Sequence, residues 1–203
     1  GRSDCKECPP GNYCEGDGTI DFMPCSPGTY QDEKEGITCK TCPTGSFSAN
    51  NMSAACTPAS RGTYCPEEGM NEALPCPAGS FSETGASVCT ACVAGRYQES
   101  AGQSECMSCE AGRYGRGTGS TSASVCGSCQ PGTYSATAGA SNCTACANGH
   151  FQSELGQTSC HSCVEYYNDN TLQSNPSGTG CEKSKSILTG EEADSFEDAL
   201  WGD

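Results

Sequence analysis

Residues 89–109 read CTACVAGRYQESAGQSECMSC, and this stretch contains the pattern that decides the fold. Cys92 opens the pattern, a glycine follows three residues later, and an aromatic residue follows two residues after that. Cys106 closes the pattern and Cys109 opens the next copy. Such internal self-similarity is typical of a repeat architecture. The motif C-x-x-G-x-[YF] begins at eight cysteines: Cys8, Cys25, Cys42, Cys76, Cys92, Cys109, Cys129 and Cys146.

Aromatic residues mark the period of the repeat. Successive members of the series are 16 or 17 residues apart, with one interval of 20: Tyr13, Tyr30, Phe47, Tyr64, Phe81, Tyr97, Tyr114, Tyr134 and Phe151. We therefore divide residues 1–181 into tandem cysteine-rich repeats, which open near positions 8, 25, 42, 59, 76, 92, 109, 129, 146 and 163.

Each repeat is predicted to form a small β-hairpin. The glycine after the opening cysteine permits a turn with positive φ, the aromatic residue begins a short strand, and a second turn returns the chain to the closing cysteine. The predicted fold class is small and disulfide-rich. It is an elongated ladder of β-hairpin repeats with little regular secondary structure and a short C-terminal helix. In such a stacked array each repeat is expected to touch only its neighbours.

Composition explains why covalent bonds must hold this chain together. Its 203 residues include 20 Cys but only 5 Phe, 8 Tyr and 1 Trp. These are too few large apolar side chains to offset the conformational entropy of the chain. Rossmann folds, TIM barrels, helical bundles and most enzymes are thereby disfavoured. So many cysteines favour an oxidising compartment, and we predict a secreted, extracellular or cell-surface protein.

Charge and hydropathy narrow the range of partners. The formal net charge of −15 disfavours nucleic acids and anionic membranes, because both are polyanions. The sequence has no run of about 18 apolar residues, so we expect no direct membrane insertion of this segment. The chain begins at Gly1 rather than Met, which we interpret as a segment of a secreted precursor.

The recurring motif, with its C-x-x-C closure, resembles the ephrin-receptor-like cysteine-rich repeat. More broadly it is similar to the disulfide ladders of the growth-factor-receptor and tumour-necrosis-factor-receptor class. The resemblance covers roughly residues 5–181 and implies an extracellular module. Modules of this type occur in receptors, adhesins, matrix proteins and surface coats, so the resemblance does not imply one function.

The simplest disulfide scheme closes each repeat on itself. In the first repeat Phe22 stands where the closing cysteine belongs, and Cys14 directly follows the aromatic residue, so a short Cys8–Cys14 bridge is predicted. A rival scheme instead pairs Cys8 with Cys25 and Cys14 with Cys39. The remaining pairs of the simplest scheme are Cys25–Cys39, Cys42–Cys56, Cys76–Cys89, Cys92–Cys106, Cys109–Cys126, Cys129–Cys143, Cys146–Cys160 and Cys163–Cys181.

The simplest scheme leaves two cysteines without a disulfide partner. Ala59 and Ala73 stand where the fourth repeat should open and close, which leaves Cys65 without a mate, and Cys5 is left over near the start of the chain. Each is a candidate for a free thiol, an unusual long-range bridge or a bridge between chains. A bridge from Cys5 of one copy to Cys65 of the next would be heterologous, so repeated copies would grow a filament.

The sequence predicts no catalytic site, metal or cofactor. Cys89, Cys92, Cys106 and Cys109 have the spacing of a zinc ribbon, but the series continues as an unbroken ladder with no natural grouping into fours. Neither histidine lies in a catalytic motif, and we interpret His150 and His161 as exposed spacers. Weak calcium binding by scattered carboxylates is left open.

Attached glycans are expected. Asn51-Met-Ser53 is an N-glycosylation sequon, and Asn142-Cys-Thr144 is a poorer one because its central cysteine is expected to be bridged. Residues 118–124 form either an O-glycan loop or a plain flexible loop.

The last segment, residues 182–203, is an acidic tail with six acidic and no basic residues from position 190 onward. Thr189-Gly-Glu-Glu192 reads as a capping box, which predicts a helix over residues 190–201. A helix this short is unstable alone in water. Phe196, Leu200 and Trp201 should therefore dock on the ladder or on a partner.

These features favour a non-enzymatic, extracellular structural or interaction protein, which serves as a building block or spacer of a surface coat, matrix or filament. Its expected partners are proteins, further copies of itself among them. The alternative is a receptor ectodomain that binds a protein ligand. That alternative requires some repeats to carry irregular, exposed aromatic or charged loops, and only the repeats at 109–126 and 163–181 are enlarged.

Overall fold

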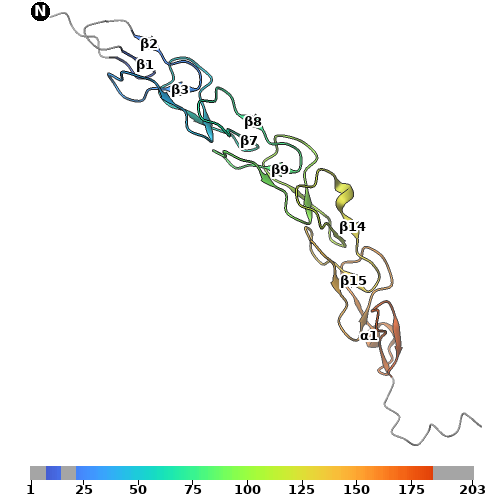
Figure 1. Ribbon diagram of the computed structural model, residues 1–203. Helices are drawn as coiled ribbons and strands as arrows, with labels where there is room; N and C mark the ends of the chain where they lie inside the picture. The colour runs from blue at the N-terminus through green and yellow to red at the C-terminus, as the bar shows by residue number, and fades with distance from the viewer. Residues whose placement is uncertain (1–7, 15–21, 185–203) are drawn as a thin grey trace, which may run out of the picture. The chain divides into compact units, whose positions relative to one another are not determined.

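A computed structural model describes residues 8–14 and 22–184 of the chain (Figure 1). It confirms a disulfide-rich chain of small β-hairpins with little helix. The strands are β1 (Asn12–Tyr13), β2 (Met23–Pro24), β3 (Thr29–Tyr30), β4 (Lys40–Thr41), β5 (Ser46–Phe47), β6 (Thr57–Pro58), β7 (Thr63–Tyr64), β8 (Leu74–Pro75), β9 (Ser80–Phe81), β10 (Thr90–Ala91), β11 (Arg96–Tyr97), β12 (Met107–Ser108), β13 (Arg113–Tyr114), β14 (Gly127–Ser128), β15 (Thr133–Tyr134), β16 (Thr144–Ala145), β17 (His150–Phe151), β18 (His161–Ser162), β19 (Leu172–Ser174) and β20 (Cys181–Lys183). The helices are the 3₁₀ turn η1 (Ala123–Val125) and α1 (Cys163–Tyr167).

Contacts divide the chain into two compact bodies. The first contains residues 1–110, 114–127 and 138–142, and the second contains residues 111–113, 128–137 and 143–203. Hairpins β1–β2 to β11–β12 belong to the first body, where Figure 1 shows them in chain order. The second body holds β15–β16, β17–β18, β19–β20 and α1. None of the helices in the described residues could span a membrane.

In most repeats the hairpin pairs the aromatic strand with the two residues inside the following C-x-x-C. In the second repeat Thr29 lies opposite Thr41 and Tyr30 opposite Lys40. The turn before the aromatic strand depends on Gly28, whose φ of 83° lies in the left-handed region that favours glycine. Two sequence features therefore set the strand register in such a repeat. The glycine fixes where the first strand begins, and the C-x-x-C fixes which two residues form the second strand.

A buried polar side chain follows the aromatic residue in most repeats. Gln31 is one example, 2% exposed: its Nε2 donates to the Thr38 carbonyl and its Oε1 accepts from the Glu33 amide. The side chain thereby satisfies backbone groups of the second turn that no strand pairs. The other buried members of this set are Ser48, Ser82, Gln98, Ser135 and Gln152.

Consecutive repeats are joined by backbone hydrogen bonds. The Gly28 amide donates to the carbonyl of Ser48 over 2.8 Å, and the Met52 amide donates to the carbonyl of Cys25 over 2.9 Å. In each case the bond links the second repeat to the third. Because both partners are backbone groups, the contact tolerates side-chain variation between repeats.

The expectation that each repeat touches only its neighbours is wrong. A Cβ atom at Gly28 would collide with the backbone carbonyl of Gly69, which lies two repeats further along the chain. Equivalent approaches in the first body pair Gly45 with Gly85, Gly62 with Gly102, and Gly79 with Gly119; in the second body Gly112 meets Gly156. Each repeat thus interlocks with the repeat after next, because the absence of a Cβ lets two backbones meet directly.

Cysteines make up most of the buried hydrophobic residues. Among the described residues the buried hydrophobic side chains are cysteines, apart from Ala59 and Phe151. Nine disulfides are present among these residues, and they are the pairs of the scheme that closes each repeat on itself. The rival pairs Cys8–Cys25 and Cys14–Cys39 are not formed. The disulfides therefore supply the interior that the composition lacks.

Candidate interaction surface

The repeat that opens at Cys163 departs from the pattern, because α1 replaces its first turn. Tyr166 occupies the position at which other repeats have glycine. The left-handed turn of the other repeats is unfavourable for tyrosine, and the segment forms a short helix instead. The Ser162 hydroxyl accepts a hydrogen bond from the Glu165 amide at the helix start, and Asn168 ends the helix with a φ of 50°.

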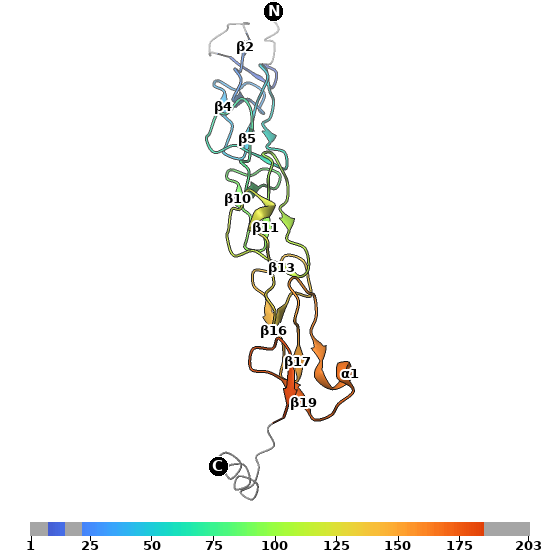
Figure 2. The same ribbon diagram turned by 90° about the vertical axis from the view of Figure 1, so that its right-hand side faces the viewer.

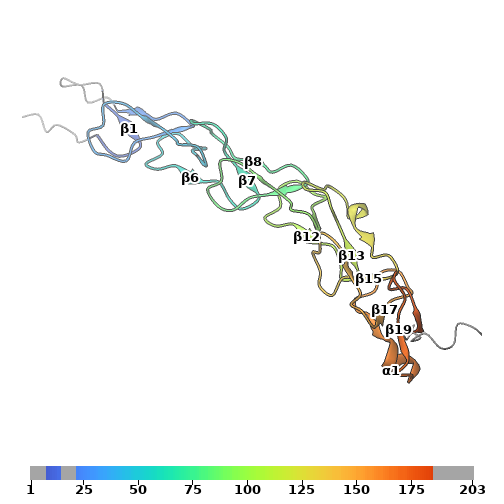
Figure 3. The same cartoon turned by 60° about the horizontal axis from the view of Figure 1, so that its bottom comes forward.

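Aromatic rings gather where α1 meets β17 and β18. Phe151, which is 4% exposed, forms the base of the cluster. Its ring centroid lies 5.3 Å from that of Tyr166, in a T-shaped contact, and 5.8 Å from that of Tyr167. The His161 ring completes the group, 5.3 Å from Tyr166. Figures 2 and 3 show α1 beside the strands β17 and β19 of the same body.

The outer side of this cluster faces solvent. Tyr166 is 60% exposed, Tyr167 52% and Val164 38%. Glu165, also exposed, forms no ion pair within the described part of the chain. A surface hollow of about 270 Å³ lies beside Tyr166, with His161, Ser162 and Glu165 in its wall. We call the exposed surface of Val164, Glu165, Tyr166 and Tyr167 the α1 face.

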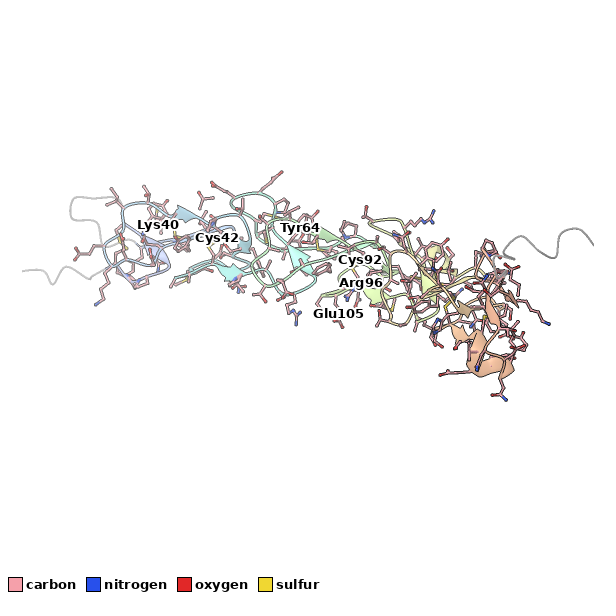
Figure 4. All side chains as sticks on the ribbon, turned by 90° about the horizontal axis from the view of Figure 1, so that it is seen from below. Lys40, Cys42, Tyr64, Cys92, Arg96 and Glu105 are labelled. Carbon is pink, nitrogen blue, oxygen red and sulfur yellow. A yellow bond between two sulfur atoms is a disulfide. The ribbon has the colours of Figure 1, made fainter. Side chains whose placement is uncertain are left out.

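A second hollow, of about 360 Å³, lies in the first body. Arg61, Glu83, Arg96 and Glu105 line it together with apolar groups that include Val93; Figure 4 labels Arg96 and Glu105. The Arg61 Nε atom lies 3.1 Å from a Glu83 carboxylate oxygen, in an exposed ion pair. Two positive and two negative side chains balance here, so the lining does not select one ligand chemistry.

Cys65 is buried rather than presented at the surface. Its side chain is completely inaccessible, and it is the free cysteine among the described residues. Burial raises the pKa of the Cys65 thiol, because the charged thiolate is disfavoured away from water. This placement argues against the bridge from Cys65 to another chain, which requires a thiol at the surface. Cys5 lies outside the described residues.

Both predicted N-glycosylation asparagines are exposed. Asn51 lies in the second turn of its repeat, and Asn142 precedes Cys143, which is bonded to Cys129. The loop at residues 118–124 is largely exposed and leads into η1. Phe196, Leu200, Trp201 and the helix predicted over 190–201 lie outside the described residues.

The structure changes the interpretation of one histidine. His161 is exposed, as expected, but it belongs to the aromatic cluster rather than standing free as a spacer. His150 is exposed and forms a hydrogen bond through Nδ1 to the Asn148 carbonyl. Within residues 8–14 and 22–184, no three His, Cys, Asp or Glu side chains gather as a metal site.

Sequence reasoning missed α1, although its signal was present. Ser162 and Glu165 have the S-x-x-E spacing of a capping box, and two tyrosines follow directly. The signal was missed because residues 163–181 were interpreted as one more hairpin repeat. The single α-helix in the described residues therefore lies in the last repeat.

Comparison with known families agrees with this architecture. Residues 79–126 and 132–178 match the family described as tyrosine-protein kinase ephrin type A/B receptor-like. The two matched segments begin in the repeat that opens at Cys76 and extend into the irregular repeat that carries α1, and the repeats before residue 76 lie outside them. A comparison with curated proteins found no match.

Proposed function

Because this chain contains ephrin-receptor-like cysteine-rich repeats joined in a disulfide ladder, we propose that it is a structural spacer of an extracellular coat or matrix. The many disulfides place it outside the cell or in the secretory pathway. The observation that carries the proposal is the interlocking of each repeat with the repeat after next. The contact of Gly28 with the Gly69 carbonyl is one case in the first body, and that of Gly112 with Gly156 is one in the second.

Interlocking of this kind resists bending within a body. A repeat that contacts only its neighbours can hinge at each junction, whereas a contact across two junctions opposes rotation at both. The disulfides add a second restraint, since the 14-residue separation of Cys25 and Cys39 limits how far that loop can extend. Both features suit a chain that holds other elements at a fixed distance.

Small-angle scattering of the oxidised chain tests this role. A compact globule of 203 residues would have a radius of gyration of about 17 Å. A spacer should give a value well above this, unchanged between low and high salt. A value near 17 Å, or a strong dependence on salt, would contradict the proposal.

A second function, binding of a protein ligand in the manner of a receptor ectodomain, is favoured by the α1 face. The regular repeats form similar hairpins, so none of them offers a surface of its own to a ligand. The repeat that opens at Cys163 differs, because its Tyr166 and Tyr167 are exposed. Tyrosine is enriched at the energetic centres of protein interfaces. Ligand binding is compatible with the spacer role, because a spacer can carry a binding repeat.

A further inference from the structure

We propose that the α1 face binds a basic side chain, arginine or lysine, of a protein partner. The Glu165 carboxylate would pair with the cation while the Tyr166 ring packs against it. This inference rests on the second function above and goes further by assigning the chemistry of the partner.

The geometry supplies a firm aromatic platform. Tyr166 contacts Phe151 in a T-shaped arrangement at 5.3 Å, and Tyr167 lies 4.9 Å from Tyr166. Phe151 is itself buried, and Cys163, the first residue of α1, is bonded to Cys181. The rings are thus held in place before any partner arrives, which lowers the entropic cost of binding.

The charges favour a cation over other ligands. Glu165 is exposed and forms no ion pair within the described residues. It is adjacent in sequence to Tyr166, and both line the hollow of about 270 Å³ beside α1. The formal net charge of −15 adds a long-range field that attracts basic partners and repels acidic ones. A purely apolar partner would leave Glu165 desolvated and unpaired, at a cost in affinity.

The first body shows the same contact inside the chain. The Arg116 guanidinium carbon lies 5.3 Å from the centroid of the Tyr114 ring. That distance is within the range of a cation–π interaction. At the α1 face Tyr166 is 60% exposed and no cation of the described residues covers it, so a partner can supply one.

An NMR titration of the full oxidised chain tests the proposal. The probe is a capped five-residue peptide, Gly-Arg-Gly-Arg-Gly, and its control replaces both arginines by citrulline, which keeps the shape and removes the charge. The arginine peptide should shift the ring resonances of Tyr166 and His161, and the citrulline peptide should bind more weakly. Glu165→Gln and Tyr166→Ala should each weaken binding about fivefold, as expected for exposed ionic and cation–π contacts.

Glu110→Gln is the matched control, because it removes one exposed negative charge from the first body. It should leave the affinity unchanged, and the nine disulfides should remain in every variant. Equal affinity for the two peptides would overturn the proposal. So would an equal loss of binding in Glu110→Gln, because net charge alone would then explain the attraction.

Two other occupants of the α1 face would also overturn the proposal. If the C-terminal segment of the chain covers the face, Tyr166→Ala should shift the fluorescence of Trp201, the single tryptophan. If a second copy covers it, sedimentation should reveal an oligomer that Tyr166→Ala dissociates. The spacer role depends on the scattering result instead, so the two proposals can fail separately.

Discussion

Ala59 and Cys65 occupy the positions that Cys8 and Cys14 occupy in the first repeat. The members of each pair are six positions apart in the sequence, and Cys8 and Cys14 form a disulfide with their Cα atoms 6.2 Å apart. Ala59 is completely buried, as is Cys65. The fourth repeat therefore has the arrangement of the first repeat with one sulfur atom missing.

Ala59→Cys should create a new disulfide with Cys65. The Cys8–Cys14 bridge shows that this spacing suits a disulfide. Closing so short a loop should stabilise the fold by about 2 kcal/mol in the chain-entropy model. Peptide mapping by mass spectrometry checks the bridge, and denaturant unfolding checks the stability. Ala59→Ser, which adds a similar volume without a thiol, is the control; a free thiol persisting at both positions would contradict the prediction.

Cys65 should resist alkylation in the native chain and react once the chain is denatured without reductant. Its side chain is inaccessible, and burial raises its pKa, so little reactive thiolate is present at neutral pH. Iodoacetamide labelling followed by peptide mapping locates the modified residue. Rapid labelling of Cys65 in the folded chain would contradict the buried position.

Stability should fall in alkaline solution because of this thiol. A raised pKa in the folded state means that, as pH rises past the unfolded pKa, the unfolded chain loses its proton first. The stabilising effect of the buried, protonated Cys65 thiol is therefore fully present at neutral pH. It is lost as pH rises from the unfolded-state pKa through the folded-state pKa. Cys65→Ser should remove this dependence. Serine is tolerated at this position, since Ser48 and Ser82 occupy it in neighbouring repeats. Denaturant unfolding at several alkaline pH values would measure the difference.

Gly112→Ala should destabilise the second body more than Gly149→Ala. Both glycines have positive φ, at 80° and 78°, so the backbone strain of alanine is similar. A Cβ at Gly112 would collide with the Gly156 carbonyl, whereas a Cβ at Gly149 meets nothing within 4 Å. The strain should cost about 1–2 kcal/mol at both positions, and the collision about 1–3 kcal/mol more at Gly112. Equal unfolding midpoints of the two variants would show that the interlocking contributes no stability.

Asn51 should carry an N-linked glycan when the chain passes through a eukaryotic secretory pathway. The side chain is exposed in a turn, so it is accessible for attachment of a sugar. Asn142 should be occupied less, because Cys143 is held in a disulfide within the sequon. Glycopeptide mass spectrometry gives the occupancy of both sites, with Asn51→Gln as the control. Higher occupancy at Asn142 than at Asn51 would contradict this order.

Reduction should unfold the chain under conditions in which the oxidised form is stable. Apart from cysteines, Phe151 and Ala59 are the hydrophobic residues buried in the described part. Without the bridges too little apolar surface is buried to offset chain entropy. Circular dichroism and limited proteolysis before and after full reduction would show the loss. Retained resistance to protease in the reduced chain would point to a source of stability other than the disulfides.

The amino-acid sequence by itself determined the repeat length and the hairpins, and it favoured closure of the regular repeats by their own disulfides while leaving a rival pairing open for Cys8 and Cys14. It could do so because these depend on local features: a glycine that permits a left-handed turn, and cysteines about 14 residues apart. The sequence likewise showed that Cys65 had lost its mate. Its spacing from Ala59 repeats that of Cys14 from Cys8.

Only the tertiary structure decided how repeats meet and where a distinct surface lies. The approach of Gly28 to Gly69 joins residues 41 positions apart, and no local pattern encodes such a distance. Burial of Cys65, which opposes the predicted bridge between chains, depends on the same stacking. The α1 face arises because Tyr166 cannot make the glycine turn, and because packing on Phe151 fixes the helix so that Tyr166 and Tyr167 stay exposed.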